Sequence, residues 1–527
     1  MAQARFIGDM FTSNTLEFEE NLIDRNLVPI PVSDSHFGIL NLRAIHAGHN
    51  SLTHEMVFMV DRSASMDEGC GDGKTKMQHI CHILKNMVAY FKEHPSIDAF
   101  ITICTFDDDC DTILERTAVT DRNLGTVIAT IDSILPRGST NIARAIQHIN
   151  QCCSSIRAQF PSHKISSVFM TDGQATAGEE GGAALSDMVD KNFDNIFIGV
   201  GLDHDGALLS TLGSGKNSNY YFIDKLENSG FVYGEIIHGF IYTIVNNARI
   251  TIDNGLIYDF KNNVWVKSID IGNIVGDSNK TYHVSTHEPK LCWATISGNE
   301  LDGAEMDPIS IVTSDEFVKL EKYVYRQQTL QHLYNVNEFI KRQNQQDQHD
   351  VFAVLKPPNV EKSIVDETKK IRTALHEFIN EMKIYMTVNN FTNDSFMNNL
   401  CDDIYICYRT FTTKHAAMYT VARQSSQGAQ RCYTVNYTPD NDHVLPPPTP
   451  KLHRVGNKFP LPPILMRQNA RAIIDDIDQP DDIAHVVSSF DDTQSPYRTP
   501  SSVTLMRALS GAPQKNESDI EDQEEEL

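Results

Sequence analysis

The sequence predicts an α/β fold: a doubly wound, mostly parallel sheet inserted in a small antiparallel β-sandwich, followed by an α-helical region and a disordered tail. Apolar runs without alternation at residues 57–60 and 168–170 indicate strands buried on both faces, as in a parallel sheet. Residues 75–93, which follow the first run, have apolar side chains at helical spacing. From residue 248 to about 312, short strands lie between Asn, Asp and Gly turns, a pattern typical of a small sandwich.

The α/β domain is predicted to span residues 54–247. Further strands are expected at residues 98–106, 195–200 and 220–223, and further helices at residues 123–134 and 231–245. The alternation of strands and helices implies a parallel-type sheet that is covered by helices on both faces.

The sandwich is predicted to be discontinuous, with residues 34–53 and 248–313 contributing to it. Alternation at residues 37–45 indicates one strand outside the parallel sheet, and we expect it to pair with strands that follow the α/β domain. Residues 1–33 form a polar N-terminal segment with few signals.

Two regions follow the sandwich. Residues 314–423 are predicted to be helical, with helices at residues 315–343, 360–387 and 394–408 forming a hairpin or small bundle. Residues 424–527 lose periodicity, contain proline-rich stretches at 445–450 and 460–463, and end in an acidic run, so we expect a mostly disordered tail. The proline-rich stretches suit either a linker or a ligand of SH3- or WW-type domains.

Composition limits the classes of partner. The 527 residues suffice for roughly two to four domains, and a net charge of −25 argues against nucleic acids and anionic membrane surfaces. No apolar run approaches the length of a membrane span, and residues 1–20 show no secretory signal. The ten cysteines form no C-x-x-C pair, which favours reduced thiols and an intracellular, cytoplasmic protein.

Oxygen-bearing side chains follow the two buried strands. Asp61, Ser63 and Ser65 come directly after the first strand, and Asp172 follows the second, ahead of Gly173. Such loops meet at the carboxyl edge of a parallel sheet, where α/β proteins usually bind ligands. Carboxylate and hydroxyl oxygens suit Mg²⁺ or Mn²⁺. Taken singly, each side chain could equally be a loop cap or an ordinary turn hydroxyl.

The pattern Asp61-x-Ser63-x-Ser65, with Thr140 in a glycine-led turn and the Asp172-Gly173 pair, resembles the metal-ion-dependent adhesion site (MIDAS) of the von Willebrand factor type A (vWA) domain. The resemblance covers about residues 54–247. It implies a Rossmann-like fold and a cation that the three hydroxyls reach directly or through water. The two aspartates would lie close to the cation, and its open position would accept a carboxylate from a partner protein.

The wider layout is loosely similar to inter-alpha-trypsin inhibitor heavy chains and to plant vWA-containing ubiquitin ligases, although no RING cysteine pattern is present. We therefore expect an intracellular vWA protein that binds another protein through the MIDAS. The alternative is a scaffold or adaptor whose sandwich or helical region makes the contact while the metal only stabilises the fold. The sequence leaves the oligomeric state open.

An enzyme is not expected, since the sequence has no G-x-S-x-G, P-loop or H-E-x-x-H motif. A hydrolase that uses a metal-activated water is the remaining catalytic alternative.

Three neighbouring features leave alternatives open. The acidic loop at residues 107–111 could tune the metal site, hold Ca²⁺ or be a solvated loop. The glycine-rich residues 67–74 could rim the binding face or form a flexible loop. The helix at residues 231–245 corresponds in position to the helix that shifts in integrin-type vWA domains, or is simply a packed helix. His79 and His82 are expected to be a surface pair on their helix rather than metal ligands.

Overall fold

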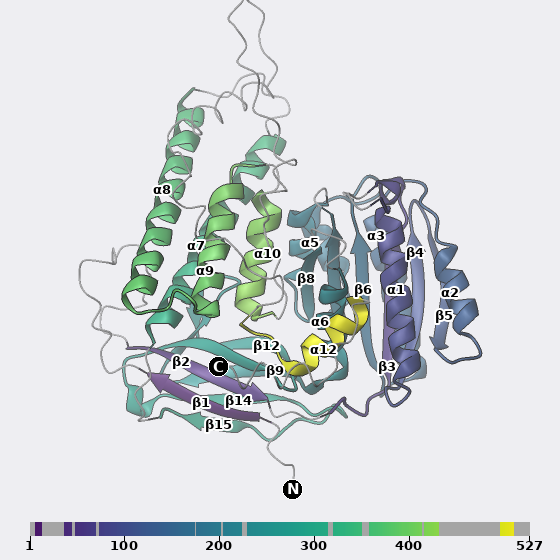
Figure 1. Cartoon of the computed structure of the whole chain (residues 1–527), viewed down its shortest axis with the longest axis horizontal. Coiled ribbons are helices and arrows are strands. Elements are labelled where there is room, and N and C mark those ends of the chain that lie inside the picture. The colour runs from purple at the N-terminus through teal and green to yellow at the C-terminus, as the bar shows by residue number, and fades with distance from the viewer. Residues whose placement is uncertain are drawn as a thin grey trace, which may run out of the picture. The chain divides into compact units, whose positions relative to one another are not determined.

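The computed structural model describes residues 6–12, 36–44, 48–69, 73–173, 175–201, 204–223, 229–314, 320–349, 358–413, 416–431 and 496–510 (Figure 1). They belong to two compact units. The first comprises the described residues of Met1–Tyr323, Ser425–Tyr433 and Tyr497–Leu527, and the second those of Val324–Gln424 and Thr434–Pro496. No helix within the described residues is both long enough and apolar enough to cross a membrane.

The first unit contains a six-stranded sheet in the order β5-β4-β3-β6-β7-β8. Its parallel strands are β3 (His54–Asp61), β4 (Ala99–Phe106), β6 (Lys164–Thr171), β7 (Asp194–Val200) and β8 (Ser218–Ile223). All eight residues of β3 are buried, which explains why its apolar residues do not alternate with polar ones. The predicted fold class is confirmed.

An antiparallel edge strand, β5 (Cys110–Ala118), completes this sheet. It was not predicted, because its first residues belong to the acidic stretch that suggested a loop. None of its residues is fully buried, as expected of an edge strand. Residues 107–109 of the acidic stretch therefore form the turn of the β4–β5 hairpin, and Cys110 and Asp111 belong to β5.

Helices in two groups cover the sheet. One group contains α1 (Lys76–Glu93), α2 (Leu124–Asp132) and α6 (Ser229–Ile241), and the other contains α3 (Ile142–Gln159), α4 (Gly182–Met188) and α5 (Gly206–Gly213). A capping box opens α1, because Thr75 Oγ1 accepts a hydrogen bond from the Gln78 N–H and the Gln78 side chain accepts one from the Thr75 N–H. The helices α4 and α5 were not predicted, since seven and eight residues show too little periodicity.

Two antiparallel sheets form the sandwich. The first has the order β1-β2-β13-β10-β11, and the second β12-β9-β14-β15. The bounds are β1 (Phe6–Thr12), β2 (His36–Ala44), β9 (Thr243–Asp253), β10 (Leu256–Asp259), β11 (Val264–Val266), β12 (Ser268–Val275), β13 (Asn279–Thr286), β14 (Trp293–Asn299) and β15 (Ile309–Val312). The strand before the α/β domain, β2, pairs with β13 after it, as predicted. Buried residues of both sheets, among them Leu40, Val284 and Ile250, share one core.

The sandwich region differs from the prediction in four places, at β1, at the end of α6, at β12 and at β15. No strand was predicted at β1, which has seven residues and lies within the polar N-terminal segment. The predicted helix at residues 231–245 extends too far, because α6 ends at Ile241 and β9 begins at Thr243. The strands β12 and β15 were not predicted. In β12, Gly272, at a φ of 73°, and irregular pairing with β9 interrupt the alternation.

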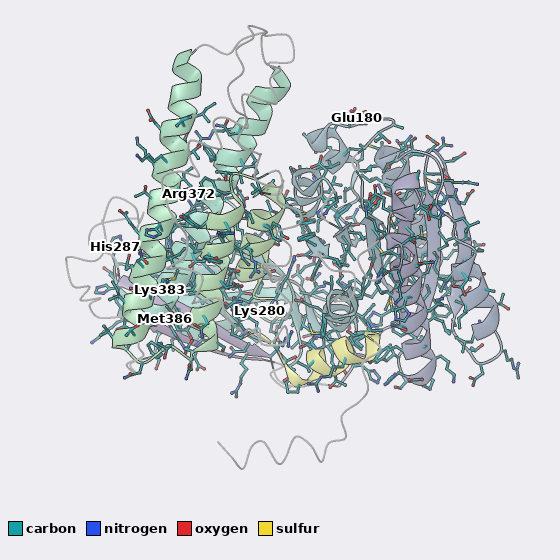
Figure 2. The ribbon with its side chains drawn as sticks, turned by 45° about the horizontal axis from the view of Figure 1, so that its top comes forward. Glu180, Lys280, His287, Arg372, Lys383 and Met386 are labelled. Carbon is teal, nitrogen blue, oxygen red and sulfur yellow. The ribbon has the colours of Figure 1, made fainter. Side chains whose placement is uncertain are left out.

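The second unit contains the helices α8 (Pro358–Val388) and α9 (Ser395–Thr410), α7 (Glu321–His349) from Val324 onward, and α10 (Ala416–Ala429) as far as Gln424. Figure 2 shows Arg372, Lys383 and Met386 along α8. Met386 is buried in the apolar core of this unit. The predicted helical region is confirmed, although α10 itself was not predicted.

A further helix, α12 (Pro500–Ser510), lies within the segment that was predicted to be mostly disordered. It packs against α6 and α1 of the first unit (Figure 1, yellow). Leu505, Met506 and Leu509 are buried in this contact, and their apolar spacing on one helix face was the missed signal. The proline-rich stretches and the acidic run lie outside the described residues.

Candidate metal centre

Parallel pairing of β3 and β6 brings the two aspartates to one edge of the sheet. His54 to Val60 of β3 lie opposite Lys164 to Met170 of β6, so Asp61 and Asp172 leave the sheet side by side. After Asp61 the chain turns through Ser63 into the short 3-10 helix η1 (Ala64–Asp67). Thr140 directly precedes Asn141, the N-cap of α3, whose side chain accepts a hydrogen bond from the Arg144 N–H.

Hydroxyl and carboxylate oxygens meet at this edge. Ser65 Oγ donates to Asp172 Oδ1 over 2.8 Å and lies 3.1 Å from Ser63 Oγ. A Cβ atom added to Gly173 would lie 3.3 Å from Thr140 Oγ1 and 3.9 Å from Ser65 Oγ, so Thr140 faces the same space. The five residues singled out in the sequence are therefore together, although their role as metal ligands stays a prediction.

Asp61 is held from two sides. Its Oδ1 accepts a hydrogen bond of 2.7 Å from the Ser63 N–H, and its Oδ2 accepts one from Thr171 Oγ1. Burial raises the pKa of Asp61 to about 6, although these hydrogen bonds act in the opposite direction. Sequence reasoning missed Thr171, whose position immediately before Asp172 was the available signal.

Backbone hydrogen bonds join the three loops. The Ala64 N–H donates to the Gly138 carbonyl over 3.2 Å, and the Arg137 N–H donates to the Arg62 carbonyl over 2.6 Å. On the other side, the Thr176 N–H donates to the Thr140 carbonyl over 3.0 Å. These bonds fix the loops relative to one another, which preorganises the oxygen atoms. The exposed rim beyond Thr176 includes Glu180 (Figure 2).

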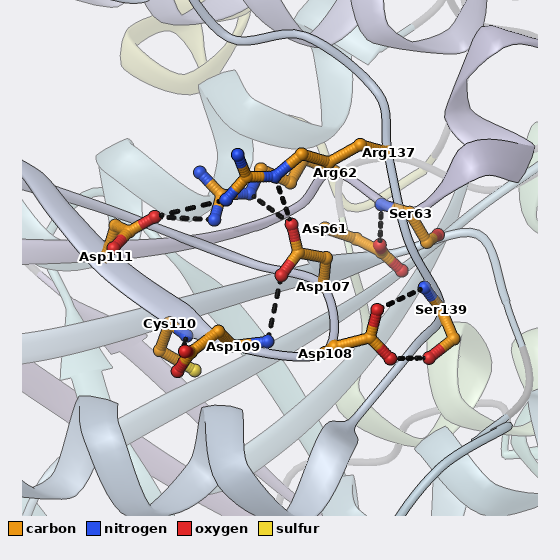
Figure 3. A network of polar contacts seen from close by, with 10 residues as sticks. All are labelled: Asp61, Arg62, Ser63, Asp107, Asp108, Asp109, Cys110, Asp111, Arg137 and Ser139. Carbon is orange, nitrogen blue, oxygen red and sulfur yellow. Dashed lines mark hydrogen bonds and ion pairs between the residues drawn. The ribbon is translucent and has the colours of Figure 1, made fainter.

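Carboxylates of the acidic loop bind arginine and serine side chains that flank the site (Figure 3). Asp107 Oδ2 accepts from Arg62 Nε over 2.9 Å and from Arg137 Nε over 2.6 Å. Burial opposes ionisation of Asp107, but these charged donors outweigh it and lower its pKa. The carboxylate of Asp108 accepts from Ser139, the neighbour of Thr140. The carboxylates of Asp107 and Asp108 are thus already paired with residues that flank the site. This pairing favours the interpretation that the acidic loop tunes the metal site over the interpretation that it holds a separate Ca²⁺.

Lys76, the first residue of α1, was not singled out in the sequence. Its Nζ donates to Asp172 Oδ2 over 2.8 Å and to Glu68 Oε2 over 2.6 Å. The lysine side chain is 8% exposed and that of Asp172 is fully buried. Burial alone would lower the pKa of Lys76, but the two carboxylates raise it, so the ammonium stays charged. Lys76 therefore binds Oδ2 of Asp172, and Oδ1 accepts the hydrogen bond from Ser65.

Residues 56–174 match the family model described as the von Willebrand factor type A domain. Among solved structures, von Willebrand factor type A from Catenulispora acidiphila is 13% identical, with 65% of this chain and 82% of that chain covered and a TM-score of 0.45. The ArnB paralog VWA2 from Sulfolobus acidocaldarius is 13% identical, with 82% and 100% covered and a TM-score of 0.44.

A mussel byssus protein, proximal thread matrix protein 1, has been solved with a zinc-occupied MIDAS motif. It is 17% identical, with 35% of this chain and 44% of that chain covered and a TM-score of 0.26. No curated protein matched the chain.

Proposed function

Because residues 56–174 match the vWA domain, we propose that this chain binds a partner protein through a divalent cation at the carboxyl edge of the sheet. The hydroxyls of Ser63, Ser65 and Thr140 would hold Mg²⁺ or Mn²⁺ together with Asp172 Oδ1. Asp61 would act through water. A Glu or Asp of the partner would supply the remaining oxygen.

The spacing of the oxygen atoms carries this proposal. An octahedral Mg²⁺ with bonds of about 2.1 Å separates neighbouring ligand oxygens by about 3.0 Å. The distances of 2.8 Å from Ser65 Oγ to Asp172 Oδ1 and 3.1 Å from Ser65 Oγ to Ser63 Oγ agree with that separation. Hydrogen bonds have similar lengths, so metal binding requires the hydroxyl protons to rotate away from the cation.

The local charge supports recognition of a carboxylate. Asp61 and Asp172 would neutralise a divalent cation, but Lys76 already compensates part of the charge of Asp172. Because Lys76 also pairs with Glu68, the bound cation would be close to neutralised, but its open position would still accept an anionic oxygen. The scattered cysteines without a C-x-x-C pair favour a reducing, intracellular location, which is part of this proposal.

A scaffold function is the second candidate, and the sandwich supplies the observation that favours it. Trp293 and Val312 are register partners on β14 and β15, and their exposed fractions are 38% and 73%. Leu291, close by in sequence, is 54% exposed. Such an apolar group at a sheet surface could contact a partner without any metal.

The test is affinity capture by the full chain with Mg²⁺ or with EDTA, combined with calorimetric titration of Mg²⁺. We expect Ser65→Ala to weaken Mg²⁺ binding at least about tenfold and to abolish the EDTA-sensitive capture. Ser133→Ala, at an exposed hydroxyl after α2, is the matched control. Capture that persists in EDTA and in Ser65→Ala, but is lost in Trp293→Ser, would favour the scaffold. Hydrolysis of phosphate esters or peptides with Mg²⁺ would contradict our proposal that the chain is not an enzyme.

A further inference from the structure

A second group of metal-binding side chains lies on the flank of the same sheet. Cys104 is on β4, and its cross-strand partner is Thr112 on β5. His148 and Cys152 are one turn apart on α3, so they share one face of that helix. Cys104 is buried, His148 and Cys152 are half-buried, and Thr112 is exposed. The group is therefore anchored in the core and open to solvent on one side.

The distances within this group suit a tetrahedral ion. One ligand atom each of Cys104, His148 and Cys152 lie within 4.8 Å of one another. The two sulfur atoms are 3.9 Å apart. Tetrahedral Zn²⁺ with Zn–S bonds of about 2.3 Å places two thiolates about 3.8 Å apart, whereas a disulfide requires about 2.05 Å.

The protonation states also suit metal binding. The hydrogen bond between the two sulfur atoms raises the pKa of Cys104 and lowers that of Cys152, so the pair shares a proton that lies where a cation would bind. Burial lowers the pKa of His148, which keeps its ring neutral and able to coordinate. Asp109 and Asp111 act on His148, and Glu115 acts on Cys152, so the surroundings contribute negative charge. A bound cation would displace the second thiol proton.

We propose that Cys104, Cys152 and His148 bind Zn²⁺, with the fourth position open to water beside the Thr112 hydroxyl. Two sulfur donors and one imidazole nitrogen are the ligands that Zn²⁺ prefers, and they disfavour Mg²⁺. Thr112 Oγ1 lies 2.9 Å from His148 Nε2 and 3.4 Å from Cys104 Sγ, at the solvent side of the group. The ion links the β4–β5 hairpin to α3, because its ligands come from both. Helix α3 begins directly after Thr140 and its N-cap Asn141.

The experiment uses the full chain, stripped of metal under reducing conditions and titrated with Co²⁺ in excess Mg²⁺. We expect one equivalent of Co²⁺ to give thiolate-to-cobalt charge-transfer absorption, and Zn²⁺ to displace it. Because the MIDAS presents only oxygen atoms, Co²⁺ bound there gives no such absorption. Cys152→Ser should abolish the signal, and His148→Ala should weaken Co²⁺ binding at least about tenfold.

Cys110→Ser is the matched control, since Cys110 lies on the same hairpin outside the group and should leave the signal unchanged. Mg²⁺ binding should persist in Cys152→Ser, and the charge-transfer signal should persist in Ser65→Ala, so failure at one site is distinguishable from failure at the other. Two results would overturn the zinc site: an equal signal in wild type and Cys152→Ser, or no signal from folded, reduced protein. A Cys104–Cys152 disulfide that forms readily, in protein that binds no Co²⁺ when reduced, would assign the pair a redox role instead.

Discussion

Two parts of the first unit are built from opposite kinds of interaction. At the carboxyl edge of the sheet, polar groups from loops converge, and ion pairs such as Lys76–Asp172 and Arg62–Asp107 link them. Where α6 meets α12, backbones approach closely over glycines, and apolar side chains fill the contact. The edge is therefore stabilised by paired charges and hydrogen bonds, whereas the helix contact is stabilised by packing.

The close approach of the two helices depends on the absence of side chains. A Cβ atom at Gly234 would lie 2.5 Å from Met506 Cα, and one at Gly230 would lie 2.5 Å from Ser510 Cα. At the α12 side, Asn86 Nδ2 donates to the Leu509 carbonyl over 2.8 Å. These helices cannot move closer without overlap between atoms, and they lose packing contacts if they move apart.

The largest effect is expected at the polar edge. Asp172→Ala leaves the buried Lys76 ammonium without its main partner, which costs about 3 kcal/mol or more of folding free energy. Urea unfolding of the metal-free protein, followed by circular dichroism, measures this loss. In Asp172→Ala/Lys76→Met we expect part of the stability to return. If the double variant is no more stable than the single one, the pair does not act as described.

A smaller effect is expected at the helix contact. Gly234→Ala forces α12 away from α6, so trypsin should cleave at Arg507 faster than in the wild type. The control is Gly239→Ala on the same helix, because a Cβ atom at Gly239 meets nothing within 4 Å. That variant should gain about 0.5–1 kcal/mol from helix propensity. Equal cleavage in the two variants would show that α12 does not depend on this close approach.

The smallest effect is expected from removing one charge beside the proposed metal. Lys76→Met frees Asp172 Oδ2 and removes a repulsive cation, so Mg²⁺ should bind severalfold more tightly. Capture of the acidic partner should weaken at the same time, because the variant removes one positive charge beside the cation. Titration calorimetry and capture at saturating Mg²⁺ separate these two effects. Tighter Mg²⁺ binding with unchanged capture would show that Lys76 does not influence the partner.

The sequence could reveal the polar edge because its signals are local. Asp61, Ser63 and Ser65 are close neighbours along the chain, and Asp172 directly follows a second buried strand that parallel pairing places next to the first. The same reasoning missed Lys76. In the sequence, this residue is simply the first residue of an amphipathic helix, and nothing there indicates that its side chain points toward Asp172. The same reasoning also missed the Cys104–His148–Cys152 group, because cross-strand and helix positions meet there only through the sheet.

The sequence by itself determined the alternation of strands and helices, the split sandwich and the order of the oxygen-bearing residues, since periodicity and turn chemistry act over a few residues. The tertiary structure alone decided that Lys76 shares the carboxylate of Asp172 and that α12 packs against α6, more than 250 residues earlier in the chain. The physical reason is that burial and close approach depend on which surfaces meet, and short-range patterns do not specify a partner so distant along the chain.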